Sequence, residues 1–101
     1  MMNTEIQALI QRRRLQLLVH SAIYYGYGES IVSDEQWKNW ALELEELQAH
    51  YTKEAAAAPY AKAFRDFDHS TGFNLPYREP AVMAKALQLL RLRNLYEKEM
   101  T

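Results

Sequence analysis

The segment from Asp34 to Tyr51 repeats apolar side chains at intervals of three and four residues. An α-helix has about 3.6 residues per turn, so this spacing gathers the apolar side chains on one helix face. The residues of that face are Trp37, Trp40, Ala41, Leu44, Leu47 and Tyr51. The segment therefore predicts an amphipathic helix, with Trp40 and Leu47 buried against the rest of the chain.

Ser33 marks the predicted start of this helix. Its hydroxyl group can accept a hydrogen bond from the backbone amide of Gln36, while the Gln36 side chain reaches back to Ser33 in a capping-box pattern. Asp34 and Glu35 place negative charge in the first turn, where it interacts favourably with the helix dipole. These signals fix the helix boundary at Ser33.

Further helices are predicted from similar spacing elsewhere in the chain, and no segment alternates apolar and polar residues as a strand does. They span residues 3–25, 59–68 and 79–97. Residues 52–58 are predicted to be a connection, because the residue before Pro59 is biased out of the helical region. The predicted fold is all-α: a compact bundle of about four helices, whose first two form a helical hairpin, in a single domain over residues 1–101.

Composition narrows the class of protein further. A chain of 101 residues can form one hydrophobic core, and a net charge of −1 creates no global field that would attract nucleic acid. The absence of cysteine removes disulfide and zinc–thiolate chemistry and is compatible with a cytoplasmic location. No apolar run approaches the roughly 20 residues of a membrane span. We therefore expect a small cytoplasmic protein without a membrane segment.

The stretch from His20 to Lys38, HSAIYYGYGESIVSDEQWK, carries a motif at the junction of the first two predicted helices. The motif comprises His20, the pair Tyr24 and Tyr25, Ile31, Asp34, and the pair Trp37 and Lys38, followed by a leucine-rich helix. In this order it resembles the N-terminal helical domain of bacterial NAD-dependent DNA ligases. Trp37 stands where that family has tyrosine, and Lys38 stands where it has aspartate.

This resemblance implies a cofactor site. In the ligase family the domain holds the nicotinamide mononucleotide half of NAD, which implies contacts from Tyr24, Tyr25, Asp34 and Trp37. The aromatic rings would stack on the cationic nicotinamide ring, and Asp34 would compensate its charge. An alternative remains open, in which these aromatic residues simply pack the corner between two helices. Short chains that resemble the ligase domain are typical of phage and prophage genomes, which implies a small accessory protein.

Basic residues define a second candidate site. Arg12, Arg13 and Arg14, together with Arg91 and Arg93, would form a phosphate-binding patch if the first and last helices lie side by side. The alternative is solvated charge at helix edges. Together with Lys38, the three consecutive arginines form the predicted interaction surface for a protein partner.

Three functions follow as expectations, none of them catalytic, because the sequence contains no nucleophile elbow and no glycine-rich phosphate loop. No metal site is predicted, since His20, His50 and His69 are widely separated in the sequence. The first expectation is an accessory protein that acts by protein–protein interaction, for example as an inhibitor of a host or defence enzyme. The second is a module that binds NAD or nicotinamide mononucleotide, and the third is a nucleic-acid-associated protein.

Overall fold

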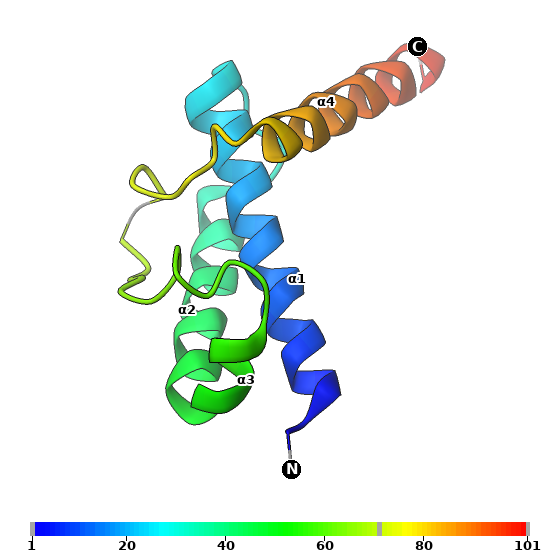
Figure 1. The fold of residues 1–101 in the computed structure, drawn as a ribbon. Coiled ribbons are helices and arrows are strands. Elements are labelled where there is room, and N and C mark those ends of the chain that lie inside the picture. The colour runs from blue at the N-terminus through cyan, green and yellow to red at the C-terminus, as the bar shows by residue number, and fades with distance from the viewer. Residues whose placement is uncertain (1, 71, 101) are drawn as a thin grey trace.

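Helices account for every regular element in the computed structural model, which describes residues 2–70 and 72–100. The elements in chain order are α1 (Thr4–Ser21), the π-helical turn η1 (Ala22–Gly26), α2 (Asp34–His50), α3 (Thr52–Ala57) and α4 (Pro80–Met100). Helices α1 and α2 run antiparallel and side by side, with α3 packed beside their lower ends (Figure 1). The predicted all-α class and the predicted hairpin of the first two helices are confirmed.

The boundaries of α1 follow from local chemistry. The Asn3 side chain accepts hydrogen bonds from the backbone amides of Glu5 and Ile6 at 3.0 and 3.1 Å, which satisfies two of the free amides at the helix start. The helix then continues without a break into η1, which ends at Gly26. The predicted helix over residues 3–25 therefore matches α1 and η1 taken together.

The core lies between the α1–α2 hairpin, the loop after α3 and the first half of α4. Its fully buried residues from α1 and η1 are Ile10, Leu17, Leu18, Ala22 and Ile23. Helix α2 contributes Ala41 and Leu44. The prediction that Trp40 and Leu47 are buried is wrong in degree, because both are only half-buried and pack against the edge of the core. A rotation of 100° per residue places them to one side of Leu44, which faces α1 directly.

The predicted third helix over residues 59–68 is wrong, and so is the predicted connection over residues 52–58. Helix α3 occupies Thr52–Ala57, and residues 59–66 form a series of turns. Ala58 takes an extended conformation before Pro59, as expected for a residue that precedes proline. Tyr60 then adopts a positive φ of 69°, which is uncommon for a non-glycine residue and prevents a helix from starting there.

Arg14 holds this irregular segment in place from the middle of α1. Its side chain is 2% exposed and donates to Gln48 Oε1 from Nε at 3.0 Å and from Nη2 at 2.8 Å. Further hydrogen bonds reach the backbone carbonyls of Ala55, Ala58 and Pro59 at 2.9, 3.1 and 3.0 Å. One guanidinium group thus holds the end of α3 and the residues that follow it, because its planar donors suit several acceptors at once. Burial lowers the pKa of Arg14 from its ordinary value.

Helix α4 leaves the body of the protein and projects beyond it (Figure 1). Its first half packs against the core through Val82, Ala86 and Leu90. Hydrogen bonds tie it to the segment after η1: the Tyr27 hydroxyl group donates to the Met83 carbonyl, and Arg93 donates to the Ser30 carbonyl, both at 3.3 Å. The molecule is accordingly elongated, with principal extents of 50 × 26 × 25 Å.

A first testable prediction concerns the start of α2. The Ser33 hydroxyl group accepts a hydrogen bond from the Gln36 amide at 3.0 Å, as the sequence predicts. Replacing Ser33 with alanine leaves this amide without its side-chain acceptor, and we expect a loss of about 1 kcal/mol in the free energy of unfolding. Chemical denaturation followed by circular dichroism measures this loss. A neutral substitution would show that the cap contributes nothing to the stability of α2.

Candidate functional site

A pocket of about 440 Å³ opens at the end of the hairpin where η1 meets the start of α2. The end of α1 and η1 form one wall, and the segment Ser30–Ser33 with the first turn of α2 forms a second. His69, Ser70 and Gly72 form a third. Five residues of the motif line this pocket: Tyr24, Tyr25, Asp34, Trp37 and Lys38. The structure therefore brings together all four residues that the ligase resemblance implies, with Lys38 beside them.

The π-helical turn positions the two tyrosines. Such a turn contains one more residue than an α-helical turn, and π-helical turns are frequent at functional sites. The Tyr24 side chain is 56% exposed, and its ring meets the ring of Tyr25 edge to face, with centroids 4.9 Å apart. Tyr25 is supported from behind by Phe73 and Tyr77, at centroid distances of 5.4 and 5.6 Å. Tyr25 is therefore braced by the core, whereas Tyr24 presents its ring to solvent.

Trp37 is the aromatic side chain that α2 contributes to the pocket. It is half-buried, and its ring meets Phe67 edge to face at a centroid distance of 6.4 Å. The backbone of Gly72 lies directly against it, since a Cβ atom at Gly72 would come within 2.9 Å of Trp37 Cζ2 and would also overlap the Ser21 hydroxyl group. Only glycine at position 72 leaves room for this arrangement of Trp37 and Ser21.

Two polar side-chain atoms of the α1 wall are buried. His20 Nδ1 and Ser21 Oγ make no hydrogen bond to any of the described residues. The His20 ring lies 5.5 Å from the ring of Trp40, centroid to centroid. Burial lowers the pKa of His20, so its imidazole is neutral at pH 7. Buried polar atoms almost always have partners, but each of these two has almost no accessible surface, so a molecule in the pocket would reach them only if the wall moved.

The first turn of α2 supplies the charges of the pocket. Asp34 and Lys38 are both exposed and lie one helical turn apart on the same face, so the pocket presents both signs of charge. A carboxylate can accept hydrogen bonds from hydroxyl groups, and an ammonium group can only donate. The first turn of α2 can therefore bind a ligand that carries both hydroxyl groups and charged groups.

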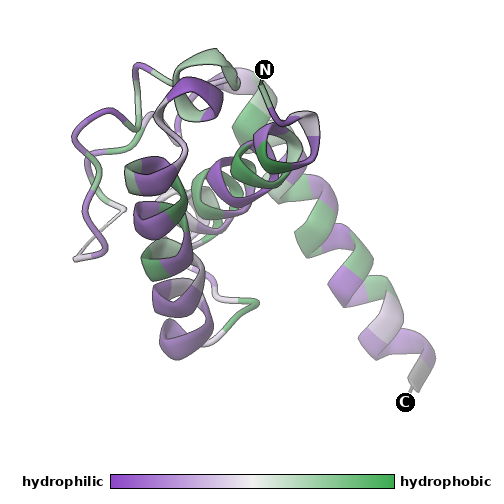
Figure 2. Ribbon diagram, turned by 90° about the horizontal axis from the view of Figure 1, so that it is seen from below, coloured by the Kyte–Doolittle hydropathy of each residue, from purple (hydrophilic) through white to green (hydrophobic). Residues whose placement is uncertain are grey.

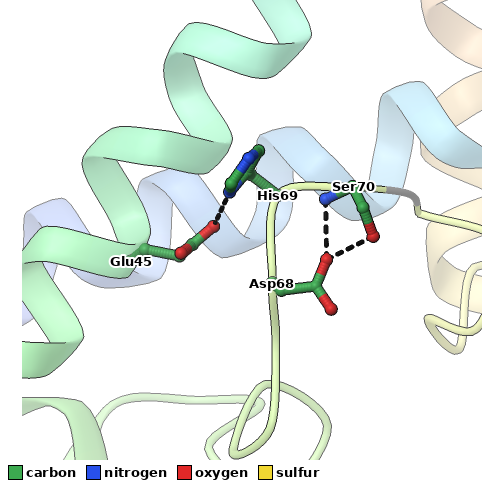
Figure 3. A network of polar contacts seen from close by, with 4 residues as sticks. All are labelled: Glu45, Asp68, His69 and Ser70. Atoms are coloured by element: carbon green, nitrogen blue, oxygen red, sulfur yellow. Dashed lines mark hydrogen bonds and ion pairs between the residues drawn. The ribbon is translucent and has the colours of Figure 1, made fainter.

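The sequence did not assign the residues of the third wall to the candidate site. His69 Nδ1 lies 2.6 Å from Glu45 Oε2 of α2, which pins the loop to the hairpin (Figure 3). Asp68 accepts hydrogen bonds from the hydroxyl group and the backbone amide of Ser70, and these bonds lower the pKa of Asp68. The Asp68-His69-Ser70 sequence is typical of a turn, and this local pattern could have predicted the turn from the sequence. The contact with Glu45 spans 24 residues and leaves no pattern in the sequence.

The predicted interaction surface of Arg12, Arg13, Arg14 and Lys38 does not form one patch. Arg14 is buried, so its assignment to a surface is wrong. Arg13 pairs with Glu43 of α2, with Nε and Oε2 2.6 Å apart, and Arg12 is exposed outside the pocket that Lys38 lines. On α4, Arg93 is engaged with Glu29 at 3.4 Å. Arg13 and Arg14 therefore hold the fold, which differs from both sequence interpretations, whereas the exposed Arg12 agrees with the interpretation of solvated charge.

Comparisons with known proteins were made at three levels. The chain matches no family model, no curated protein and no solved structure. The resemblance to the ligase domain is accordingly carried by the motif from His20 to Lys38. Among the described helices, none has the length and apolarity that would be needed to cross a membrane.

A second prediction follows from the burial of His20. Since the folded state disfavours its protonation, the unfolded chain binds a proton more readily below pH 6.5, the ordinary pKa of histidine. Folding stability should therefore fall as the pH drops through that value, by at most about 1.4 kcal/mol per pH unit for this single group. Denaturation at pH 7.5 and pH 5.5 measures the loss, which should be smaller in a His20→Gln variant. If the wild type and His20→Gln lose equal stability between the two pH values, His20 is not the group responsible for the loss.

Proposed function

We propose that this protein is a non-catalytic binding protein whose pocket takes nicotinamide mononucleotide, either free or as part of NAD. The observation that carries the proposal is the convergence of Tyr24, Tyr25, Asp34 and Trp37 on one pocket. Its volume of about 440 Å³ lies within the range of roughly 300–1,000 Å³ that is usual for small-molecule sites. The ligase resemblance supplies the identity of the ligand.

The chemistry of the walls supports this ligand. Tyr24 and Trp37 line the pocket from different elements, η1 and α2, and aromatic faces attract a cationic ring. Asp34 offers a negative charge to the nicotinamide ring and an acceptor to ribose hydroxyl groups. Lys38 stands where the ligase family has an acidic residue, and it should weaken binding by repelling the cationic ring.

A second candidate is a phage- or prophage-type accessory protein that acts through a protein partner, for example as an inhibitor of a host or defence enzyme. One observation favours it: the projecting half of α4 exposes Leu92, Leu95 and Tyr96, each more than half accessible to solvent. In this alternative Lys38 belongs to the partner surface and makes no contribution to nucleotide affinity.

Calorimetric titration separates the two candidates and gives a third prediction. The wild type should bind nicotinamide mononucleotide and NAD but not AMP. Lys38→Asp should tighten binding of the mononucleotide by about tenfold, equivalent to about 1.4 kcal/mol, because an opposite charge replaces a like charge at an exposed site. Trp37→Ala should abolish binding through the loss of one stacking face.

Arg12→Asp is the matched control for Lys38→Asp. It makes the same change of charge at an exposed position that does not line the pocket, so nucleotide affinity should not change. No detectable binding by either the wild type or Lys38→Asp at millimolar ligand would rule out the pocket proposal and favour the interaction protein. Equal tightening by Lys38→Asp and Arg12→Asp would point to a general charge effect rather than a contact in the pocket.

A further inference from the structure

We infer that α4 pairs in antiparallel orientation with α4 of a second copy of this chain. The interaction surface is an apolar strip on the projecting part of the helix, formed by Leu92, Leu95 and Tyr96 and ending at Lys85 and Glu99. This inference is independent of the proposed nucleotide pocket, because none of these residues lines it.

The apolar strip is unusually exposed for its composition. Leu92, Leu95 and Tyr96 are 54%, 59% and 67% accessible, and they lie within about one helical turn of one another. Single exposed leucines are common on protein surfaces, but large apolar side chains gathered on one face mark an interaction site. Figure 2 shows the hydrophobic and hydrophilic colours alternating along α4 after it leaves the body of the protein.

The body of the protein does not cover this face. The side of α4 that packs on the core carries Val82, Ala86 and Leu90, which are 1%, 0% and 7% accessible. A rotation of 100° per residue places Leu92 more than 90° away from the centre of that buried side. The apolar strip is therefore open to a partner while α4 stays anchored to its own chain.

Charge at the two ends of the strip identifies the partner. Lys85, Leu92 and Glu99 follow one another at intervals of seven residues, so they lie nearly in line along one face over about 21 Å. Lys85 and Glu99 are both exposed. A strip with a positive end, an apolar centre and a negative end is complementary to a second copy of itself in antiparallel orientation.

Two-fold symmetry makes this complementarity explicit. With the axis at Leu92, each Leu92 faces its equivalent, and Lys85 of each copy faces Glu99 of the other. The interface thereby gains two opposite-charge pairs around an apolar centre, as in a symmetric dimer that uses the same surface twice. Parallel pairing would instead place lysine against lysine and glutamate against glutamate, which is unfavourable. Antiparallel pairing with a second copy is thus the arrangement that the charges favour.

The expected dimer is weak, because a contact between two helices over about 21 Å falls at the low end of interface sizes. Analytical ultracentrifugation of the full chain from about 1 μM to about 1 mM should show a shift from monomer to dimer with concentration. Leu92→Asp should remain monomeric throughout, because it buries a charge at the symmetry axis. Circular dichroism checks that this variant keeps its helical content.

A charge exchange tests the orientation of the pair. Lys85→Glu and Glu99→Lys should each weaken self-association by about tenfold, since each creates two like-charge contacts. The double variant Lys85→Glu/Glu99→Lys should restore it to near the wild-type value. Glu97→Lys is a matched control for Glu99→Lys at an exposed position of α4 away from the strip, and it should change association little. A wild type that stays monomeric at the highest concentration, or a double variant that fails to recover, would overturn the inference.

Discussion

Replacing Arg14 with alanine is expected to lower the free energy of unfolding by about 3–5 kcal/mol. The guanidinium group donates to the Gln48 side chain of α2. It also donates to the backbone carbonyls of Ala55, Ala58 and Pro59, in α3 and the residues directly after it. Alanine leaves buried carbonyl groups without donors and opens a cavity beside Phe64, whose ring lies 5.8 Å from the guanidinium carbon. Urea denaturation followed by circular dichroism measures the loss.

Two matched variants identify the cause of that loss. Arg12→Ala removes the same side chain at an exposed position of α1, two residues away, and should change stability by less than about 0.5 kcal/mol. Arg14→Lys keeps the charge but cannot form the same set of hydrogen bonds, because lysine lacks the planar fork of arginine, and it should recover only part of the loss. A loss below about 1 kcal/mol for Arg14→Ala would mean that the segment after α3 is held by other contacts.

Replacing Gly72 with alanine is expected to destabilise the fold by about 1–3 kcal/mol and also to remove the proposed nucleotide binding. The added methyl group would overlap the Ser21 hydroxyl group and approach Trp37 Cζ2 to 2.9 Å, so the loop or the tryptophan must move. Both line the pocket, and a shift of either changes its shape. Denaturation, tryptophan fluorescence and nucleotide titration of the same variant measure the three consequences.

Gly26→Ala is the control for this substitution. A Cβ atom at Gly26 would meet the thioether end of Met83 at 3.0 and 3.1 Å, and this flexible end can move aside. We therefore expect a smaller loss of stability than for Gly72→Ala. If the two substitutions lower the free energy of unfolding equally, the close contact of Gly72 with Trp37 is not the cause of the loss in Gly72→Ala.

The elements that the sequence predicts well are those whose causes are local. Helix α2 begins at Asp34 because Ser33 caps it, and both the cap and the apolar spacing can be read within one segment. The same holds for most of the candidate site, because Tyr24, Tyr25, Asp34, Trp37 and Lys38 come from one continuous stretch. A stretch that folds as a helical corner brings its own residues together without help from distant parts of the chain.

The features that the sequence did not predict depend on distant contacts. Tyr60 takes a left-handed conformation that local preferences disfavour, in a segment whose carbonyls bond to Arg14 more than forty residues earlier. Three consecutive arginines indicate solvated charge, yet the third, Arg14, is buried. Its burial is possible because backbone carbonyls after α2 accept its hydrogen bonds. His69 likewise reaches the pocket wall through a single contact with Glu45. None of these partners can be inferred from the residues beside them.

The π-helical turn has a consequence for how this chain should be aligned with others. The Tyr27 amide donates to the Ala22 carbonyl, five residues back instead of four, so the turn holds one residue more than the α-helix that precedes it. Each residue advances an α-helix by about 100°, and the side chains after the turn are therefore out of phase with those before it. An alignment that keeps one helical period through this corner assigns Tyr24 and Tyr25 to the wrong face. A relative that lacks the extra residue would align with this chain only if one gap is placed between Ser21 and Gly26. Its aromatic pair would then have to be compared by superposing the two structures rather than by sequence position.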